Sequence, residues 1–439
     1  MEELALLLAR IHFGFSTAAH IMWPSLTIGL GVYLAYLNTL YYRTQNKLYL
    51  DMFDRWKTVF AIAFGLGVVS GVPLSLLLGG QWSEWARVTS PVLGPLIGYE
   101  VLSAFFLEAG FLGIALWGRN RVSPLAHLIS TYLVAIGTFG SAFWILSANS
   151  WMQTPTGYSV NELGQFIPED WMEIIFNPSF GYRFFHMAVA AFLTTGLVVT
   201  AVGAYHTLTK QNIKQAKHML RHGIVAVALL APTQAVIGDL HGLNTLEYQP
   251  AKVAAMEGIY HDEQEAGWIV FGIPNNETKE VDYAVEIPYA ASLILTHHAT
   301  GEASEIKGLE SFEYGEDIPV GTVFWSFRIM IALGCLMIAL GAWGMFEMYK
   351  GRLDTNRRFL QACMVMGPTG WIAVFFGWVV SESGRQPFSV YGLLTTRDSF
   401  SNLTSSEVIF SLAAFGIAYA IAFSIGMVFM MKAANKEMN

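Results

Sequence analysis

The sequence contains little charge and almost no cysteine. Of its 439 residues, 13% are Asp, Glu, Lys or Arg, and only Cys335 and Cys363 are cysteines. Both cysteines lie in apolar stretches, so the sequence offers neither a disulfide framework nor a cysteine zinc site. Low charge combined with a hydrophobic content of 54% excludes a disordered chain, a coiled coil and a nucleic-acid-binding protein. A polytopic membrane protein is the class that is left.

Long apolar runs recur along the whole chain. A window of about 19 residues predicts nine helices, each long enough to cross ~30 Å of hydrocarbon. We expect them near residues 13–42, 56–80, 92–117, 125–149, 184–208, 219–238, 323–346, 363–381 and 407–431. The first is longer than one crossing needs, so it should be tilted or partly interfacial. The predicted fold class is therefore all-α, with nine transmembrane helices.

Basic residues are distributed unevenly between the two sides of these spans. Sixteen Lys and Arg fall on one side and eight on the other, and Arg328 lies inside a span. Positively charged loops stay in the cytoplasm, so the N-terminus is predicted outside and the C-terminus inside.

One connection is far longer than the others. Residues 239–322 contain sixteen Asp or Glu, three Lys and no Arg, and 84 residues are too many for a passive link. Within this outer segment, residues 248–259 and the apolar stretch 283–295 predict ordered elements packed at the membrane surface. The chain is thus divided into helices one to six (1–238), an outer segment (239–322) that serves as a lid or substrate loop, and helices seven to nine (323–439).

Several ionisable side chains fall inside the predicted spans. Each costs roughly 2.5 to 3.5 kcal/mol or more at the bilayer centre, so each needs a partner, a cavity or a function. The residues are His20, Glu100, Glu108, His186, Arg328 and Glu382. Imidazole, thioether and carboxylate groups are all axial ligands for heme iron, and a helical bundle is a place where such sites are built. Met330 joins the candidates because it follows Arg328 by two residues, at the same depth as His186.

Glu100 and Glu108 are eight residues apart in the third predicted span. On a helix this is about two turns and ~12 Å of rise, so the two carboxylates should face broadly the same side. The arrangement suits a proton route, and Ser103 and Ser141 are candidates to hydrate it. The alternative is a pair of buried acids that stay neutral.

The segment 381–388 reads Ser-Glu-Ser-Gly-Arg-Gln-Pro-Phe and breaks the eighth span at its outer end. Irregular polar backbone at that depth needs a cavity or a cofactor to satisfy it. Its residues 384–387 match the GRQP signature of subunit I of the cytochrome bd-type quinol oxidases, with Trp378 and Glu382 at the expected places before it. Residues 105–108, 144–153 and 327–330 also look like segments of that family. The chain resembles this family from end to end.

The resemblance implies three heme groups. His186 and Met330 would be the axial ligands of a low-spin heme b, with Arg328 beside it. His20 and Glu382 would ligate two high-spin hemes, a heme b and a heme d that some relatives replace by heme b; which heme each residue holds is left open. Trp378 would contribute to cofactor binding, and Arg385 to the catalytic site.

The resemblance also implies an activity. Lys252 and Glu257 would bind and deprotonate quinol on the outer side, while Glu100 and Glu108 would line the route by which cytoplasmic protons reach the oxygen site. Oxygen would be reduced to water, and proton motive force would arise without a pump. The implied partners are subunit II in a heterodimer, small single-span subunits, quinol, O2 and the lipid bilayer, in a bacterial plasma membrane.

Two features depart from the family pattern. Phe388 follows the GRQP signature where many relatives have Trp, and the outer segment lacks the insertion of the long-loop branch. The short-loop branch is therefore expected, and the details of the quinol site transfer less directly.

Two other classes of membrane protein compete with this interpretation. Cytochrome b of the quinol–cytochrome c reductases needs two bis-histidine pairs, and a heme-copper oxidase needs a histidine cluster, but the membrane histidines here are too few and too dispersed. A proton-coupled transporter that uses Glu100, Glu108, Arg328 and Glu382 would show broken helices in matching halves, whereas a single break, in the eighth span, is visible in the sequence.

Overall fold

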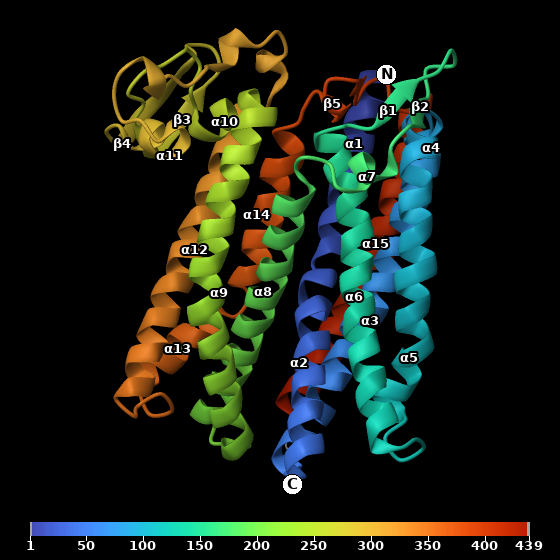
Figure 1. Ribbon diagram of the computed structural model, residues 1–439, viewed down its shortest axis with the longest axis vertical. Coiled ribbons are helices and arrows are strands. Elements are labelled where there is room, and N and C mark those ends of the chain that lie inside the picture. The colour runs from blue at the N-terminus through green and yellow to red at the C-terminus, as the bar shows by residue number, and fades with distance from the viewer. Residues whose placement is uncertain (1, 437–439) are drawn as a thin grey trace.

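The structure is a computed structural model and describes residues 2–436. Over these residues it is a bundle of long helices, and nine segments are long and apolar enough to cross a membrane. The two ends of the chain lie at opposite ends of the bundle, as an odd number of crossings requires (Figure 1). The prediction of nine transmembrane helices is confirmed; which end faces the cytoplasm remains a prediction from the basic residues.

The helices form two groups that pack side by side (Figure 1). The first group contains α1 (Glu2–Ile21), α2 (Pro24–Thr44), α3 (Lys47–Gly80), α4 (Ser83–Tyr99), the π-helix η1 (Glu100–Phe105), α5 (Phe106–Trp117), α6 (Pro124–Gln153) and α15 (Ser405–Asn435). The second contains α8 (Phe180–Leu208), α9 (Ile213–Tyr248), α12 (Val320–Tyr349), α13 (Arg357–Met366) and α14 (Thr369–Ser383).

Helix α8 joins the two groups, because it packs on α2 and α6 as well as on α9. Small residues allow these close approaches. A Cβ at Gly29 of α2 would lie 2.2 Å from Thr195 Oγ1, and one at Gly223 of α9 would lie 2.1 Å from Thr200 Oγ1. In a bilayer, where apolar burial drives little helix association, such tight backbone contacts supply the packing.

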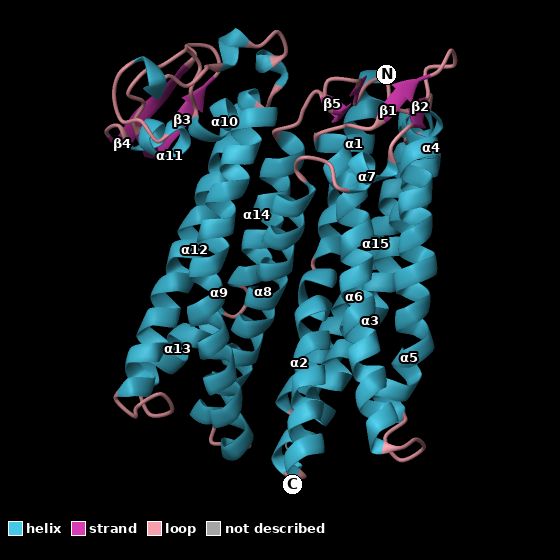
Figure 2. Ribbon diagram, viewed as in Figure 1, coloured by secondary structure: helices cyan, strands magenta, loops and turns pink. Residues whose placement is uncertain are grey.

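Short strands and helices cap the end of the bundle at which the N-terminus lies (Figure 2). They are β1 (Tyr158–Val160), β2 (Phe166–Pro168), α7 (Trp171–Ile175), α10 (Pro250–Glu257), β3 (Trp268–Asn275), β4 (Glu280–Ile287), α11 (Ala290–Thr296), the short helices η2 (Glu302–Ser304), η3 (Leu309–Ser311) and η4 (Gly315–Asp317), β5 (Phe388–Val390) and β6 (Leu394–Thr395). Each of the pairs β1–β2, β3–β4 and β5–β6 is antiparallel.

Two spans that read as continuous apolar stretches in the sequence are each built from two helices. The first consists of α1 and α2, separated at Trp23 because Pro24 begins a new helix. The eighth consists of α13 and α14, separated at Gly367 and Pro368. Trp371 of α14 donates its indole N–H to the carbonyl of Met22 (2.9 Å), so it satisfies a backbone group at the first break.

The outer segment begins later than the predicted boundary at residue 239. Helix α9 continues to Tyr248, and α10 follows after Gln249 at a sharp change of direction. The apolar side chains of α10 are buried against residues of α12, including Val320 and Val323. The first ordered part of the outer segment therefore rests directly on the transmembrane bundle.

Candidate functional site

His186 and Met330 both lie in the second helix group, each against a glycine of a neighbouring helix. A Cβ at Gly238 of α9 would lie 3.4 Å from His186 Cε1, and one at Gly377 of α14 would lie 3.2 Å from Met330 Sδ. Within residues 2–436, His186 Nδ1 is buried and has no hydrogen-bond partner. An unpartnered imidazole and a thioether between close-packed helices are a donor set that suits heme iron. These residues fit the predicted group.

His241 is a neighbour of this site that the sequence did not reveal. It lies past the predicted end of the sixth span, but α9 continues beyond it. Its ring meets that of His186 edge to face, with 5.4 Å between the centroids. If the sixth span had been predicted to continue to residue 248, His241 would have been placed in the same layer of the bundle as His186.

Arg328 is buried one-third of the way along α12 and turns toward the outer segment. Its guanidinium donates to the carbonyls of Ile269 (2.8 Å) and Met256 (2.5 Å), and it lies 3.5 Å from Glu257 Oε2. The side chain also stacks on Phe324, 3.4 Å from the ring centroid. Arg328 thus ties α12 to α10 and β3, which is a role beyond the one expected from its depth alone.

His20 lies in the last turn of α1, just before the break. Its Nδ1 is 3.0 Å from Ser70 Oγ, whose hydroxyl donates to the carbonyl of Leu66 (2.8 Å). With the serine proton directed to this carbonyl, Nδ1 would be the donor to Ser70 Oγ, and the lone pair of Nε2 would be left for a metal. A Cβ at Gly71 would lie 3.0 Å from His20 Cε1, so this residue of α3 must stay small. The donor and its surroundings fit iron ligation.

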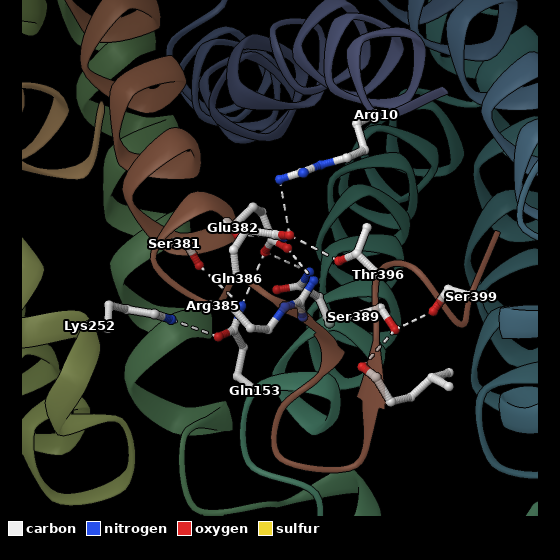
Figure 3. A network of polar contacts seen from close by, with 12 residues as sticks. Arg10, Gln153, Lys252, Ser381, Glu382, Arg385, Gln386, Ser389, Thr396 and Ser399 are labelled. Carbon is white, nitrogen blue, oxygen red and sulfur yellow. Dashed lines mark hydrogen bonds and ion pairs between the residues drawn. The ribbon is translucent and has the colours of Figure 1, made fainter. Parts of the chain in front are cut away.

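Glu382 occupies the last turn of α14 and stands at the centre of a polar network (Figure 3). Its Oε1 accepts hydrogen bonds from Asn149 Nδ2 and Gln153 Nε2, both at 3.2 Å. Its Oε2 is paired with Arg385 at 2.5 Å. Trp378 lies one turn earlier on the same helix and is half-buried. A carboxylate held by three donors is oriented and charged, as a metal ligand should be.

Arg183 belongs to the same network, although it lies one residue before the predicted fifth span (184–208) and was not among the expected site residues. It is 7% exposed and donates to Asn149 Oδ1 and to Ser381 Oγ, the latter at 3.0 Å. It lies 3.9 Å from Glu382 Oε1. The sequence contained one indication that Arg183 belongs to the site: it precedes His186 by three residues, so the two side chains share a helix face.

Lys252 links this network to the outer segment. Its ammonium group donates to Gln153 Oε1 at 2.7 Å, and Gln153 in turn donates to Glu382 (Figure 3). Lys252 is 4% exposed, and burial, reinforced by Arg183, lowers the pKa of Lys252 well below its usual value. A single amide side chain therefore separates the predicted quinol lysine from the predicted heme carboxylate.

Glu257 ends α10 and is also buried. Burial raises the pKa of Glu257 to about 7, and the nearby Arg328 opposes that rise. A carboxyl group with such a pKa exchanges protons readily near neutral pH, which suits a general base.

Glu100 and Glu108 both face α6, as their spacing predicted. Ser141 donates to Glu100 Oε1 at 2.6 Å, and Glu108 packs so closely on Gly137 that a Cβ there would lie 2.5 Å from Glu108 Cγ. Between them, η1 turns less per residue than an α-helix, because its hydrogen bonds span five residues. Glu108 is 5% exposed, whereas Glu100 is half-buried.

Comparison with known proteins shows to which protein family the chain belongs. Residues 8–438 match the family model described as cytochrome bd terminal oxidase subunit I. The chain belongs to this family. The chain is therefore a multi-pass protein of a bacterial membrane, and because the family is a cytochrome family, the chain is a heme protein. A subunit I also implies a subunit II, and a terminal oxidase is an oxidoreductase.

Individual relatives of the bd oxidase subunit cover nearly its full length. Cytochrome bd ubiquinol oxidase subunit 1 of Bacillus subtilis is 33% identical over 425 residues, which are 95% of this chain and 90% of the relative. Cytochrome bd-II ubiquinol oxidase subunit 1 of Escherichia coli is 28% identical, over 92% of this chain and 91% of the relative. The bd oxidase structure from Geobacillus thermodenitrificans superposes with a TM-score of 0.90 at 27% identity, covering 98% of each chain.

Proposed function

We propose that this chain is the catalytic subunit of a quinol:O2 oxidoreductase that oxidises quinol at the outer end of the bundle. It would reduce O2 to water with cytoplasmic protons and so generate proton motive force without a pump. One observation carries the proposal: Lys252 of the outer segment reaches Glu382 through Gln153 alone. The relatives named as ubiquinol oxidases support the same chemistry.

The heme-holding residues are assigned by their donor groups. His186 and Met330 would hold a low-spin heme b, and His20 and Glu382 would hold two high-spin hemes, one a heme b and the other a heme d or a second heme b. When bound, these groups carry electrons and bind oxygen. Arg183, Arg328 and Arg385 supply positive charge around the carboxylates, and Trp378, one turn before Glu382 on α14, would contribute to cofactor binding.

At the outer end, Glu257 acts as the general base. Its carboxylate accepts a proton from a quinol hydroxyl and releases it to water on the outer side. Lys252 is held by Gln153 and donates a hydrogen bond to the quinol oxygen. Arg328 fixes α10 by binding its carbonyl at Met256, so both residues keep their positions.

From the opposite end, protons move along α5 and η1. Glu108 accepts a proton from the cytoplasmic side and passes it toward Glu100, which Ser141 orients. Both carboxylates face α6 but lie about two turns apart, so hydroxyl groups such as Ser141 and water would carry the proton between them. Charge separation then follows from the two sides at which protons are released and consumed.

The remaining assignments concern the assembly. We propose a heterodimer with subunit II, accompanied by small single-span subunits, in a bacterial plasma membrane. The three-part division at residues 239 and 322 is kept as a functional division, with the outer segment serving quinol, as expected for the short-loop branch.

Oxygen uptake by the purified complex tests this function. Lys252→Ala should impair uptake driven by quinol more than uptake driven by an artificial electron donor, because only the first needs the outer site. Equal loss with both donors would count against a quinol role. A complex without heme absorbance would overturn the oxidase and favour a transporter.

A further inference from the structure

One part of the outer segment carries two nearly uncharged stretches. Strands β3 and β4 with α11, residues 268–296, are named the outer hairpin here. Residues 266–276 contain no charged side chain, and residues 283–296 contain one, Glu286; the charged residues between these stretches are Glu277, Lys279, Glu280 and Asp282, in the hairpin turn and the first part of β4. The neighbouring stretches 261–265 and 302–317 are rich in Asp and Glu. Solvation alone explains those acidic stretches, but it does not explain an apolar stretch between them.

The apolar side chains of the outer hairpin are exposed. Phe271, Ile273, Val285 and Leu293 are 49 to 60% exposed, and Tyr283 is 81% exposed. Phe271 and Val285 are direct partners across the two strands, so they share a face. Glu286 points to the other face, because side chains alternate along a strand, and it lies against Gly267. The hairpin therefore exposes a group of apolar side chains, with Phe271 and Val285 on one face, that residues 2–436 leave largely uncovered.

This face adjoins the first turns of α12, one of the predicted membrane spans. Phe271 meets Trp325 of α12 edge to face, with ring centroids 5.3 Å apart. Arg328 binds the carbonyl of Ile269 and so fixes β3 against the same helix. Figure 1 shows the hairpin and α11 projecting sideways from the bundle beside the end at which α12 begins. The apolar face thus extends a membrane surface at the level where a span meets the headgroups.

The charged side of the segment lies elsewhere. Lys279, near the hairpin turn, pairs with Glu310 and Glu316 at 2.9 Å, and Lys307 pairs with Asp262 at 2.7 Å. These ion pairs tie the turn to the acidic stretches and mark the side that faces water. Tyr283 and Tyr289 are exposed on the hairpin side of the segment, and tyrosine is a residue that membrane interfaces favour.

We propose that the outer hairpin inserts its apolar face into the lipid leaflet on the side of the bundle that carries α10, as an interfacial anchor. The face binds the boundary between headgroups and acyl chains, in the way that monotopic elements do. Because Arg328 joins the hairpin to the carbonyl of Met256, the anchor also holds α10 at the membrane surface. The inference concerns lipid contact and does not depend on the proposed quinol chemistry.

Fluorescence quenching in lipid nanodiscs tests the anchor. The whole complex is prepared with Cys335→Ser, and a single new cysteine is introduced by Tyr283→Cys or Leu293→Cys and labelled with an environment-sensitive dye. Glu277→Cys, in the hairpin turn, is the matched control. Phosphatidylcholine carrying a nitroxide at carbon 5 is the lipid quencher and iodide is the aqueous one. An unchanged heme spectrum shows that each variant is folded.

The proposal expects the dye at residues 283 and 293 to lose about half of its emission to the lipid quencher and little to iodide. The dye at residue 277 should show the reverse. Quenching by iodide at all three sites would overturn the anchor, because the face would then lie in water. Protection from both quenchers at 283 and 293 would also overturn it, in favour of a protein partner that covers the face.

Discussion

The polar network around Glu382 and the Glu100–Glu108 pair both contain buried carboxylates, but the two groups differ in how many hydrogen-bond donors surround them. Glu382 is bound by Asn149 and Gln153, both of α6, and by Arg385 in the turn after α14. Glu100 has one hydroxyl partner, Ser141, and Glu108 faces the bare backbone of Gly137. A carboxylate with three donors is fixed in charge and position, whereas one with few donors can change its protonation. The first arrangement suits a ligand and the second a carrier of protons.

The largest effect should follow from removing the fixed carboxylate. Glu382→Ala leaves Arg385 and Arg183 without their acid and removes a proposed heme ligand, so oxygen uptake should fall by more than about 100-fold. Heme content measured by the pyridine hemochrome assay should drop by one heme per complex. Glu162→Ala, on an exposed turn, is the control. Normal heme content in Glu382→Ala would show that this carboxylate is not a ligand.

The next prediction distinguishes a residue that carries protons from a residue that holds heme. Glu108→Gln keeps the shape of the side chain but cannot release a proton, so uptake should fall by about 100-fold while heme content stays normal. Oxygen consumption and the visible spectrum are measured on the same preparation. Full uptake in this variant would remove Glu108 from the proton route, and loss of heme would make it structural.

The connection between the network and the outer segment should matter less. Gln153→Ala removes the amide that joins Lys252 to Glu382, and the KM for quinol should rise about tenfold. Oxidation of an artificial donor should change little. Gln165→Ala, in the β1–β2 connection, is the matched control. An unchanged KM would mean that Lys252 keeps its position without Gln153.

The protonation of Glu257 should appear in the pH profile. With a pKa of about 7, the fraction of Glu257 in the carboxylate form rises about tenfold between pH 6 and pH 8, so quinol oxidation should rise over that range. The sign follows from the base, which works only when deprotonated. Glu257→Gln should be slow and flat with pH. If Glu257→Gln kept the rising pH profile, the profile would have to come from a different titratable side chain.

The smallest effect should follow from a change at Ser141, the hydrogen-bond partner of the proposed proton carrier Glu100. Ser141→Ala removes one hydrogen bond from Glu100, and uptake should fall about threefold, in line with the modest net value of such a bond. Ser103→Ala, whose hydroxyl donates to the carbonyl of Tyr99 at 2.6 Å, is the comparison. A loss as large as that of Glu108→Gln would mean that Ser141 itself carries protons.

Composition and hydropathy were sufficient to predict the nine spans, because a run of about 20 apolar residues has few other uses. They were not sufficient for the breaks. Pro24 begins a new helix beside His20, and η1 alters the turn between Glu100 and Glu108, yet both segments read as continuous apolar stretches. Local backbone changes of this kind depend on partners from other helices, such as Trp371, that no single stretch of sequence contains.

The candidate site was predicted unevenly for a similar reason. Residues that are anomalous at membrane depth, such as Glu382 and His186, stand out in sequence. Gln153, Arg183 and His241 do not, because an amide is unremarkable and the two charged or imidazole groups lie near predicted span ends. Their importance comes from contacts between α6, α8, α9 and α14, which only the fold brings together.

The most direct test of the central claim, that this bundle holds heme through the residues assigned here, is a reduced-minus-oxidised visible spectrum of the purified complex and of Met330→Leu. The account predicts heme b bands in the natural protein and loss of the low-spin band in the variant, with the high-spin bands retained. An unchanged low-spin band in Met330→Leu would contradict the assignment.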